Sequence, residues 1–214
     1  MSLKTKIILV DDHALVRAGF RLFLAGNPAV EIIGEAERGE QAIQLFLEGQ
    51  ADMLIMDISM PGIGGLEAMR RILHHDPQAL VLVYSVHHEQ VYVQRALDAG
   101  AKGYITKTSA PELLLEAIQT IRRGQVYVEK GLLKHAQPTS GLHYQSVIGE
   151  FSPREFDVFI QLARGKSVVN IAEHMHLSYK TVANYATQVR KKLHVENDIE
   201  LMRIAEHTGG LPHG

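Results

Sequence analysis

The sequence predicts two domains, an α/β domain with a five-stranded parallel sheet followed by an all-α domain of four short helices. From Lys4 to Arg123, short β-branched apolar runs alternate with longer helical patterns, as expected for strands buried on both faces. From Phe151 onward the pattern is purely helical, and a cluster of proline, threonine, serine and glycine at 138–141 separates the two regions. We therefore expect a first domain over 1–124, a linker over 125–146 and a second domain over 147–214.

Five strands are expected in the first domain, and a helical pattern follows each of them. The strands are predicted at Ile7–Val10, Val30–Gly34, Met53–Met56, Leu80–Tyr84 and Gly103–Thr106. The last helix begins at Pro111, where a first-turn proline is tolerated, and its apolar face consists of Leu113, Leu114, Ala117, Ile118 and Ile121. This alternation implies a parallel sheet with right-handed crossovers and helices on both faces. A short helix is expected in the linker, near Lys130–His135.

Serine residues mark the expected helix starts of the second domain. Ser152-Pro153-Arg154-Glu155 combines an N-cap serine, a first-turn proline and a capping-box glutamate, and Gly165 ends this helix. Ser167 starts a short helix, Ser178 caps a longer one, and a last helix runs through roughly Ile199–His207. The longer helix has a predicted buried stripe of Val182, Ala186, Val189 and Leu193. Short helices joined by tight turns match a helix-turn-helix module.

Composition and charge exclude several classes of protein. The 22 basic and 24 acidic side chains among 214 residues give a net charge of −2, which provides no overall attraction to nucleic acid or anionic lipid. The absence of cysteine excludes disulfides, thiol catalysis and cysteine-ligated metals, and it suits a reducing compartment. No apolar run approaches the ~20 residues of a membrane span, and Ile7–Val10 is too short for a signal peptide. We expect a cytoplasmic protein with no membrane contact.

Charged and hydroxyl side chains stand where the predicted strands end. Asp11 and Asp12 follow the first strand, Asp57 the third, Ser85 the fourth and Lys107 the fifth. Because the carboxyl ends of parallel strands meet at one edge of a sheet, these side chains should lie together. Three carboxylates would raise one another's pKa values, whereas Mg²⁺ and the lysine ammonium offset their charge. A single aspartate after a strand is usually a turn residue, but the full set suits phosphoryl transfer to a carboxylate.

Four stretches of the first domain match a known pattern, namely Val10-Asp11-Asp12-His13, Met56 to Pro61 with Gly64-Gly65, the Ser85 strand end, and Gly103 to Lys107. With them, about residues 4–123 resemble the receiver domains of bacterial two-component response regulators. The resemblance implies a flavodoxin-like fold in which Asp57 accepts a phosphoryl group from a sensor histidine kinase. It also implies Mg²⁺ bound by Asp11, Asp12, Asp57 and the backbone carbonyl of Ser59. Ser85 and Lys107 would contact the phosphoryl group, and a shift of Ser85 would be coupled to Tyr104.

Other phosphate chemistries fit the first domain less well. Haloacid-dehalogenase-like phosphohydrolases also use a strand-end aspartate, but they need a second aspartate two residues later, where this chain has Ser59. The run Gly62-Ile63-Gly64-Gly65 hints at a dinucleotide loop, but the last position of that motif is Glu67 and the run follows the wrong strand. No Walker A lysine is present. These glycines are best interpreted as a turn.

The longer helix of the second domain, expected between Ser178 and Leu193, contains basic residues and no acidic residue. A helix of this charge is typical of contact with nucleic-acid phosphates. Opposite the buried stripe, its side chains are small or carry hydroxyl or amide groups, which suit base edges in a major groove. The candidate DNA contacts are Lys180, Thr181, Ala183, Asn184, Thr187, Gln188, Arg190, Lys191 and Lys192.

Short motifs of the second domain match a second family pattern. These motifs are Phe151 to Glu155, Gly165-Lys166-Ser167, Lys180-Thr181-Val182 and Arg190 to Leu193. They resemble the LuxR-type helix-turn-helix, which together with a receiver implies the NarL/FixJ class of response regulators. The implied function is phosphorylation-controlled binding of a homodimer to an inverted repeat in promoter DNA, with RNA polymerase as a further candidate partner. The implied protein is no enzyme beyond the receiver's part in its own phosphorylation and dephosphorylation.

One alternative function stays open, a phospho-controlled signalling adaptor that acts by protein contact with weak or no DNA binding. Binding of residues 147–214 to random DNA at low salt would separate the two functions. The twelve histidines have no metal-binding spacing and are interpreted as mostly surface residues. His87, two residues after Ser85, is placed to flank the phosphoryl group, where it would affect the access of hydrolytic water.

Overall fold

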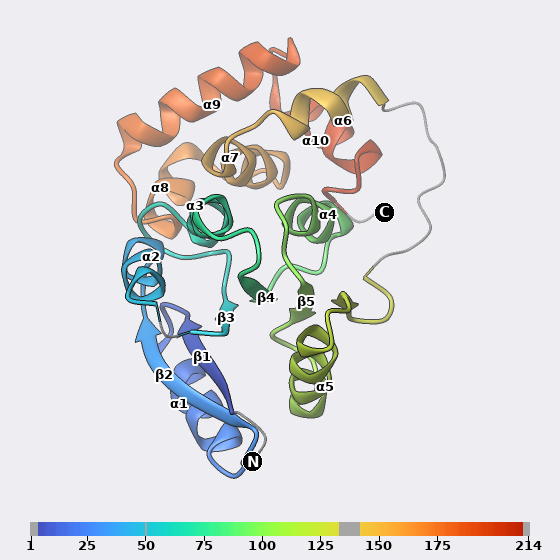
Figure 1. Ribbon diagram of the computed structural model, residues 1–214. Helices are drawn as coiled ribbons and strands as arrows, with labels where there is room; N and C mark the ends of the chain where they lie inside the picture. Colours follow the sequence, from blue (N-terminus) through green and yellow to red (C-terminus); the bar gives the residue numbers. More distant parts are fainter. Residues whose placement is uncertain (1–3, 50, 133–141, 212–214) are drawn as a thin grey trace. The chain divides into compact units, whose positions relative to one another are not determined.

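The computed structural model describes residues 4–49, 51–132 and 142–211 (Figure 1). The described chain forms two compact units, one built around a sheet and one made of helices. The linker helix expected near Lys130–His135 lies partly outside the described residues and stays a prediction. Among the described residues, no helix is long and apolar enough to cross a membrane.

The sheet of the first unit is parallel and has the strand order β2-β1-β3-β4-β5-β6. Its strands are β1 (Thr5–Val10), β2 (Val30–Ala36), β3 (Met53–Met56), β4 (Leu80–Ser85), β5 (Gly103–Thr106) and β6 (Tyr127–Val128). The five expected strands are confirmed, and a sixth strand, β6, pairs with β5 at one edge of the sheet. With only two residues, both half-buried, β6 has no apolar run that sequence patterning could detect.

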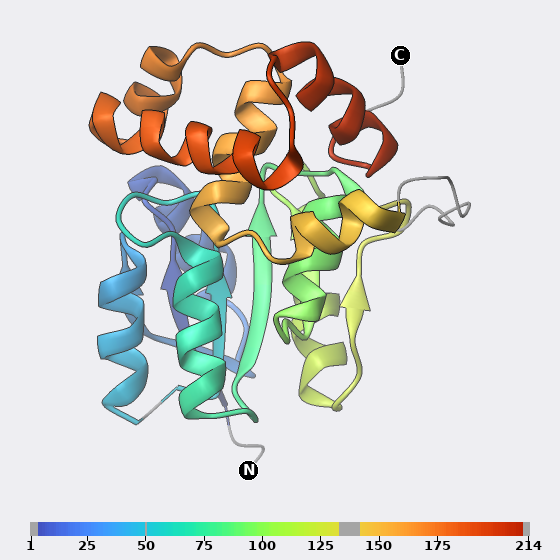
Figure 2. The same cartoon turned by 90° about the horizontal axis from the view of Figure 1, so that it is seen from above.

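Helices cover both faces of this sheet (Figures 1 and 2). They are α1 (Ala14–Leu24), α2 (Gly39–Leu47), α3 (Gly65–His75) and α5 (Pro111–Arg122). The segment between β4 and β5 forms α4 (Gln90–Asp98), of which residues 90–95 group with the second unit. Ile7 and Leu9 of β1 belong to the core cluster that includes the buried apolar side chains of α1 and α5. Since side chains alternate along a strand, Ile8 and Val10 are buried on the opposite face. Both faces of the central strands are thus buried. The carboxylates and the lysine of the predicted site therefore stand at the carboxyl ends of the strands and not along them.

The second unit consists of α6 (Leu142–Gly149), α7 (Pro153–Ala163), α8 (Val168–His174), α9 (Tyr179–Leu193) and α10 (Asp198–His207). Ser152 forms the expected capping box with Glu155, and Ser167 and Ser178 cap α8 and α9 with their hydroxyl groups. The predicted stripe of α9 is confirmed, because its four side chains are all buried. Helices α7 to α10 are the four expected ones, whereas α6 was not expected and spans the predicted boundary between linker and second domain.

Candidate functional site

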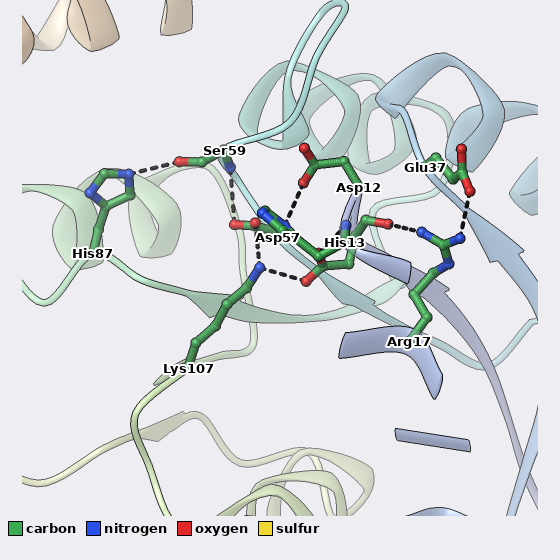
Figure 3. A network of polar contacts seen from close by, with 9 residues as sticks. Asp12, His13, Arg17, Glu37, Asp57, Ser59, His87 and Lys107 are labelled. Atoms are coloured by element: carbon green, nitrogen blue, oxygen red, sulfur yellow. Dashed lines mark hydrogen bonds and ion pairs between the residues drawn. The ribbon is translucent and has the colours of Figure 1, made fainter. Parts of the chain in front are cut away.

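The Lys107 ammonium lies between two buried carboxylates at the carboxyl edge of the sheet (Figure 3). Its Nζ atom is 2.6 Å from Asp11 Oδ2 and 2.7 Å from Asp57 Oδ2. Side-chain exposure is 10% for Lys107, 4% for Asp11 and 1% for Asp57. Burial alone would lower the pKa of Lys107, but the charges and hydrogen bonds of Asp57 and Asp11 raise it above its ordinary value. The lysine therefore stays protonated and offsets the carboxylate charge.

The backbone around Asp57 fixes the direction of its carboxylate. Its N–H donates to the Val10 carbonyl at 2.8 Å, which ties the end of β3 to the end of β1. Its Oδ1 atom accepts a hydrogen bond of 3.0 Å from the Ser59 N–H. The following loop approaches so closely that a Cβ added to Gly65 would lie 1.9 Å from the Asp57 carbonyl oxygen. The glycines interpreted as a turn therefore include one that this close backbone approach requires.

Asp57 and three residues beside it have ligand atoms close enough to share one metal ion. Asp11, Asp12, His13 and Asp57 place one such atom each within 4.8 Å of the others. Asp12 Oδ1 is buried and accepts no hydrogen bond from any described residue, although it lies 3.0 Å from His13 Nδ1. A buried carboxylate oxygen without a donor is well suited to a cation, so the acidic cluster fits Mg²⁺. His13 was not predicted as part of this cluster.

The predicted hydroxyl residues lie on the β4 and β5 side of the same site. Ser85 is fully buried, and its Oγ atom accepts a hydrogen bond of 3.4 Å from the His87 N–H. The Tyr104 hydroxyl donates to the His87 carbonyl at 2.9 Å. Burial raises the pKa of Tyr104 well above its ordinary value, so its phenol remains a hydrogen-bond donor at physiological pH. The same loop also brings His87 Nε2 to 2.7 Å from Ser59 Oγ (Figure 3).

Arg17 supports the site from α1, although the sequence pattern did not single it out. Its guanidinium donates to the Asp11 carbonyl at 2.6 Å and pairs with Glu35 at 3.1 Å and Glu37 at 2.5 Å. The side chain is 9% exposed. Arg17 thus fixes the backbone that carries Asp11 and Asp12, but its position in the helix gives no sign of this role, because its partners lie on β2 and the loop after it.

The candidate DNA contacts on α9 differ in how free their side chains are. Lys180, Asn184, Gln188 and Lys191 are exposed, and among the described residues neither of these two lysines has an ion-pair partner. The other cations are engaged, since Arg190 pairs with Asp198 at 2.7 Å and Lys192 pairs with Glu155 at 2.7 Å.

Three smaller side chains of the set are less exposed or partly bonded. Thr181 and Ala183 are half-buried, and the exposed Thr187 hydroxyl donates to the Ala183 carbonyl at 2.9 Å. The nine candidate side chains are therefore not equally available, because neighbouring helices and the helix backbone hold several of them.

Two family models match the chain. The response regulator receiver domain matches residues 7–119, and the luxR family of bacterial regulatory proteins matches residues 150–205. The chain is 35% identical over 208 residues to the response regulator UvrY of Escherichia coli K12, which covers 95% of this chain and 94% of UvrY.

The chain is also similar to solved structures, among them two of RcsB. RcsB from Salmonella enterica serovar Typhimurium, bound to promoter rprA in the presence of the phosphomimetic BeF3−, is 27% identical with a TM-score of 0.60. The match covers 94% of this chain and 98% of that one. A structure of two RcsB dimers bound to two parallel DNAs is 28% identical with a TM-score of 0.59, covering 95% and 98% of the chains.

A buried carboxylate–lysine site on one unit and a helix-turn-helix on the other define a phosphorylation-controlled, DNA-binding regulator of transcription. The chain belongs to the two-component response regulators of the NarL/FixJ class, in which a receiver domain is joined to a LuxR-type helix-turn-helix. As a member of this family it is a signalling and transcription regulator and not a classical enzyme.

Proposed function

We propose that Asp57 accepts a phosphoryl group from the phosphohistidine of a partner sensor histidine kinase. The observation that carries this proposal is the buried Asp57 carboxylate, held 2.7 Å from the Lys107 ammonium at the carboxyl edge of the sheet. In the transfer, an O–P bond forms at Asp57 while the N–P bond of the phosphohistidine breaks and returns the electron pair to the imidazole. A fixed cation beside the acceptor stabilises the charge that the phosphoryl oxygens bring into this buried site.

The proposed Mg²⁺ ligands are Asp11, Asp12, Asp57 and the backbone carbonyl of Ser59. The buried Asp12 Oδ1 atom, which lacks a hydrogen-bond donor among the described residues, supports this assignment. When bound, Mg²⁺ neutralises charge on the phosphoryl oxygens and so lowers the barrier to transfer. The residues of the chain orient the acceptor, because Ser59 N–H and Lys107 hold the two oxygens of Asp57.

We assign Ser85 and Lys107 to contact with the phosphoryl oxygens and Tyr104 to the response that follows. A phosphoryl group on Asp57 competes for the donors that now hold the carboxylate, and the hydroxyl of Ser85, at the end of the neighbouring strand β4, can add a hydrogen bond. The Tyr104 hydroxyl donates to the carbonyl of His87, two residues after Ser85, so a shift of Ser85 is transmitted to this contact. Such a shift changes the population of two receiver conformations.

Intact-mass spectrometry with acetyl phosphate and Mg²⁺ tests the acceptor. The wild type should gain one phosphoryl group, and Asp57→Asn should gain none. Asp12→Ala should weaken Mg²⁺ binding far more than Asp98→Ala, which removes an exposed carboxylate at the end of α4. Persistence of the main adduct in Asp57→Asn would place the acceptor elsewhere.

We propose that His87 restricts the access of water to phosphorylated Asp57. The Ser59–His87 hydrogen bond of 2.7 Å joins two side chains beside the acceptor and supports this role. His87→Ala opens that side, so the phosphorylated protein should lose its phosphoryl group faster, as measured by the decay of the intact-mass adduct. His88→Ala, which removes a neighbouring exposed imidazole, is the control. An unchanged half-life in His87→Ala would overturn the role.

We further propose that the protein binds promoter DNA as a homodimer that reads an imperfect inverted repeat, with α9 as its reading helix. The exposed Lys180 and Lys191 are suited to phosphates, and Asn184, Thr187 and Gln188 to base edges. The similarity to RcsB, whose dimers are bound to DNA, supports this assembly.

RNA polymerase is a further proposed partner, and the proposed place of action is the cytoplasm. The proposed domain limits are 1–124 and 147–214.

The receiver is proposed to take part in the chemistry of its own phosphorylation and dephosphorylation without acting on another substrate. Its acceptor and the cationic groups around it belong to the same unit, so a small phosphodonor should suffice for the reaction. The rate with acetyl phosphate and the decay of the adduct measure both steps.

A further inference from the structure

Glu129, which directly follows the unexpected strand β6, is hydrogen-bonded to the loop that carries Lys107. Its Oε2 atom accepts from the Thr106 N–H at 2.8 Å and from the Ser109 hydroxyl at 2.6 Å. Its own N–H donates to the Tyr104 carbonyl at 3.0 Å. The carboxylate thus binds the residue before Lys107 and the residue two positions after it.

The hydroxyl groups of this loop form a connected network around the carboxylate. Thr106 Oγ1 lies 2.8 Å from Ser109 Oγ and 3.0 Å from Thr108 Oγ1. Thr106 is buried, and Glu129 is half-buried. A partly buried network of this kind restricts the loop only when its members are satisfied, and Glu129 supplies the charged acceptor.

Two anchors therefore fix the backbone of Lys107. On one side its N–H donates to the Ser85 carbonyl at 2.7 Å, and on the other Glu129 holds Thr106 and Ser109. The lysine Nζ atom must reach both Asp11 and Asp57, each at less than 3 Å. Since a catalytic cation acts at full strength only when its position is fixed in advance, the second anchor bears directly on the phosphoryl-transfer site.

We propose that Glu129 is a positioning residue for Lys107, which it places through the loop of residues 106–109. This inference rests on the proposed role of Asp57 and Lys107 in phosphoryl transfer. The residue that positions the lysine stands at the start of the segment that leads to the helical unit. The receiver site is accordingly completed by a side chain from beyond α5, in the region that the sequence pattern assigns to the linker.

The test measures the rate at which the full-length protein forms its phosphoryl adduct with acetyl phosphate and Mg²⁺. Glu129→Ala should slow this rate about tenfold, equivalent to about 1.4 kcal/mol, whereas Glu129→Gln retains an acceptor oxygen and should recover most of the rate. Glu116→Ala is the matched control, because this carboxylate contacts β6 through the Tyr127 hydroxyl at 3.4 Å and not the lysine loop. Its rate should equal that of the wild type.

A second comparison separates positioning from general support of the fold. In the background of Lys107→Met, Glu129→Ala should slow adduct formation no further, because there is no ammonium to position. A wild-type rate for Glu129→Ala, or an equal loss in the Lys107→Met background, would overturn the proposal. Should Glu129→Ala fail to fold, Ser109→Ala removes one donor of the same contact and should slow the rate about threefold, roughly 0.7 kcal/mol. A wild-type rate there would overturn it as well. Absence of any Asp57 adduct in the wild type would instead refute the proposed function.

Discussion

Replacing Lys107 by methionine should make the folding of the sheet unit depend on Mg²⁺. The substitution keeps most of the side-chain volume but removes the ammonium that lies 2.6 Å from Asp11 and 2.7 Å from Asp57. Both carboxylates are at most 4% exposed, so water cannot replace the lost partner. Removing one member of a buried ion pair typically costs about 3–5 kcal/mol, and two neighbouring carboxylates place this case within that range.

Urea unfolding followed by circular dichroism at neutral pH measures this loss. In EDTA the free energy of unfolding should fall by about 3–5 kcal/mol in Lys107→Met, whereas Lys6→Ala, which removes an exposed lysine from β1, should change little. Magnesium binds only the folded protein and at 100 times its dissociation constant adds about 2.7 kcal/mol. At one and the same Mg²⁺ concentration, the gain should be larger for Lys107→Met than for the wild type, because the carboxylates of the variant lack a cation and should bind Mg²⁺ more tightly. A loss below about 1 kcal/mol in EDTA, or equal gains from Mg²⁺, would refute this reasoning.

Three further predictions concern other parts of the molecule. Gly65→Ala should destabilise the protein by about 1–3 kcal/mol or more in urea unfolding and slow adduct formation, because its Cβ would meet the Asp57 carbonyl. Lys191→Ala should weaken specific and random DNA binding alike and reduce the salt slope by about one, whereas Asn184→Ala should cost about 1–3 kcal/mol on the cognate site alone; equal losses on all DNA would contradict this. Burial raises the pKa of Glu155, but Lys192 and Ser152 bring it below its ordinary 4.5, so the stability it contributes is present above about pH 4.5 and lost as the pH falls through the folded-state pKa. In thermal unfolding, the gap between wild type and Glu155→Gln should close in acid.

The sequence was sufficient to predict those site residues that stand directly after a strand. Asp11, Asp57 and Lys107 follow β1, β3 and β5, and a parallel sheet brings such positions to one edge whatever the details of packing. The N-cap serines were equally predictable, because a capping bond spans only three residues.

Contacts between residues distant in sequence were not predictable from periodicity or spacing. Glu129 reaches Thr106 across 23 residues, and it stands next to a strand too short to give an apolar pattern. Lys192 looks like a free cation within α9, but Glu155, 37 residues earlier, holds it. Such pairings depend on how helices and strands pack, and a single sequence does not contain that information in its periodicity.

The most direct test of the account is whether phosphorylation of Asp57 changes DNA binding. Fluorescence anisotropy at fixed salt should measure the affinity for a cognate promoter fragment, with and without acetyl phosphate and Mg²⁺, for the wild type and for Asp57→Asn. We expect the phosphodonor to change the affinity of the wild type and to leave that of Asp57→Asn unchanged. An equal change in both proteins, or none in a wild type that mass spectrometry finds phosphorylated, would contradict it.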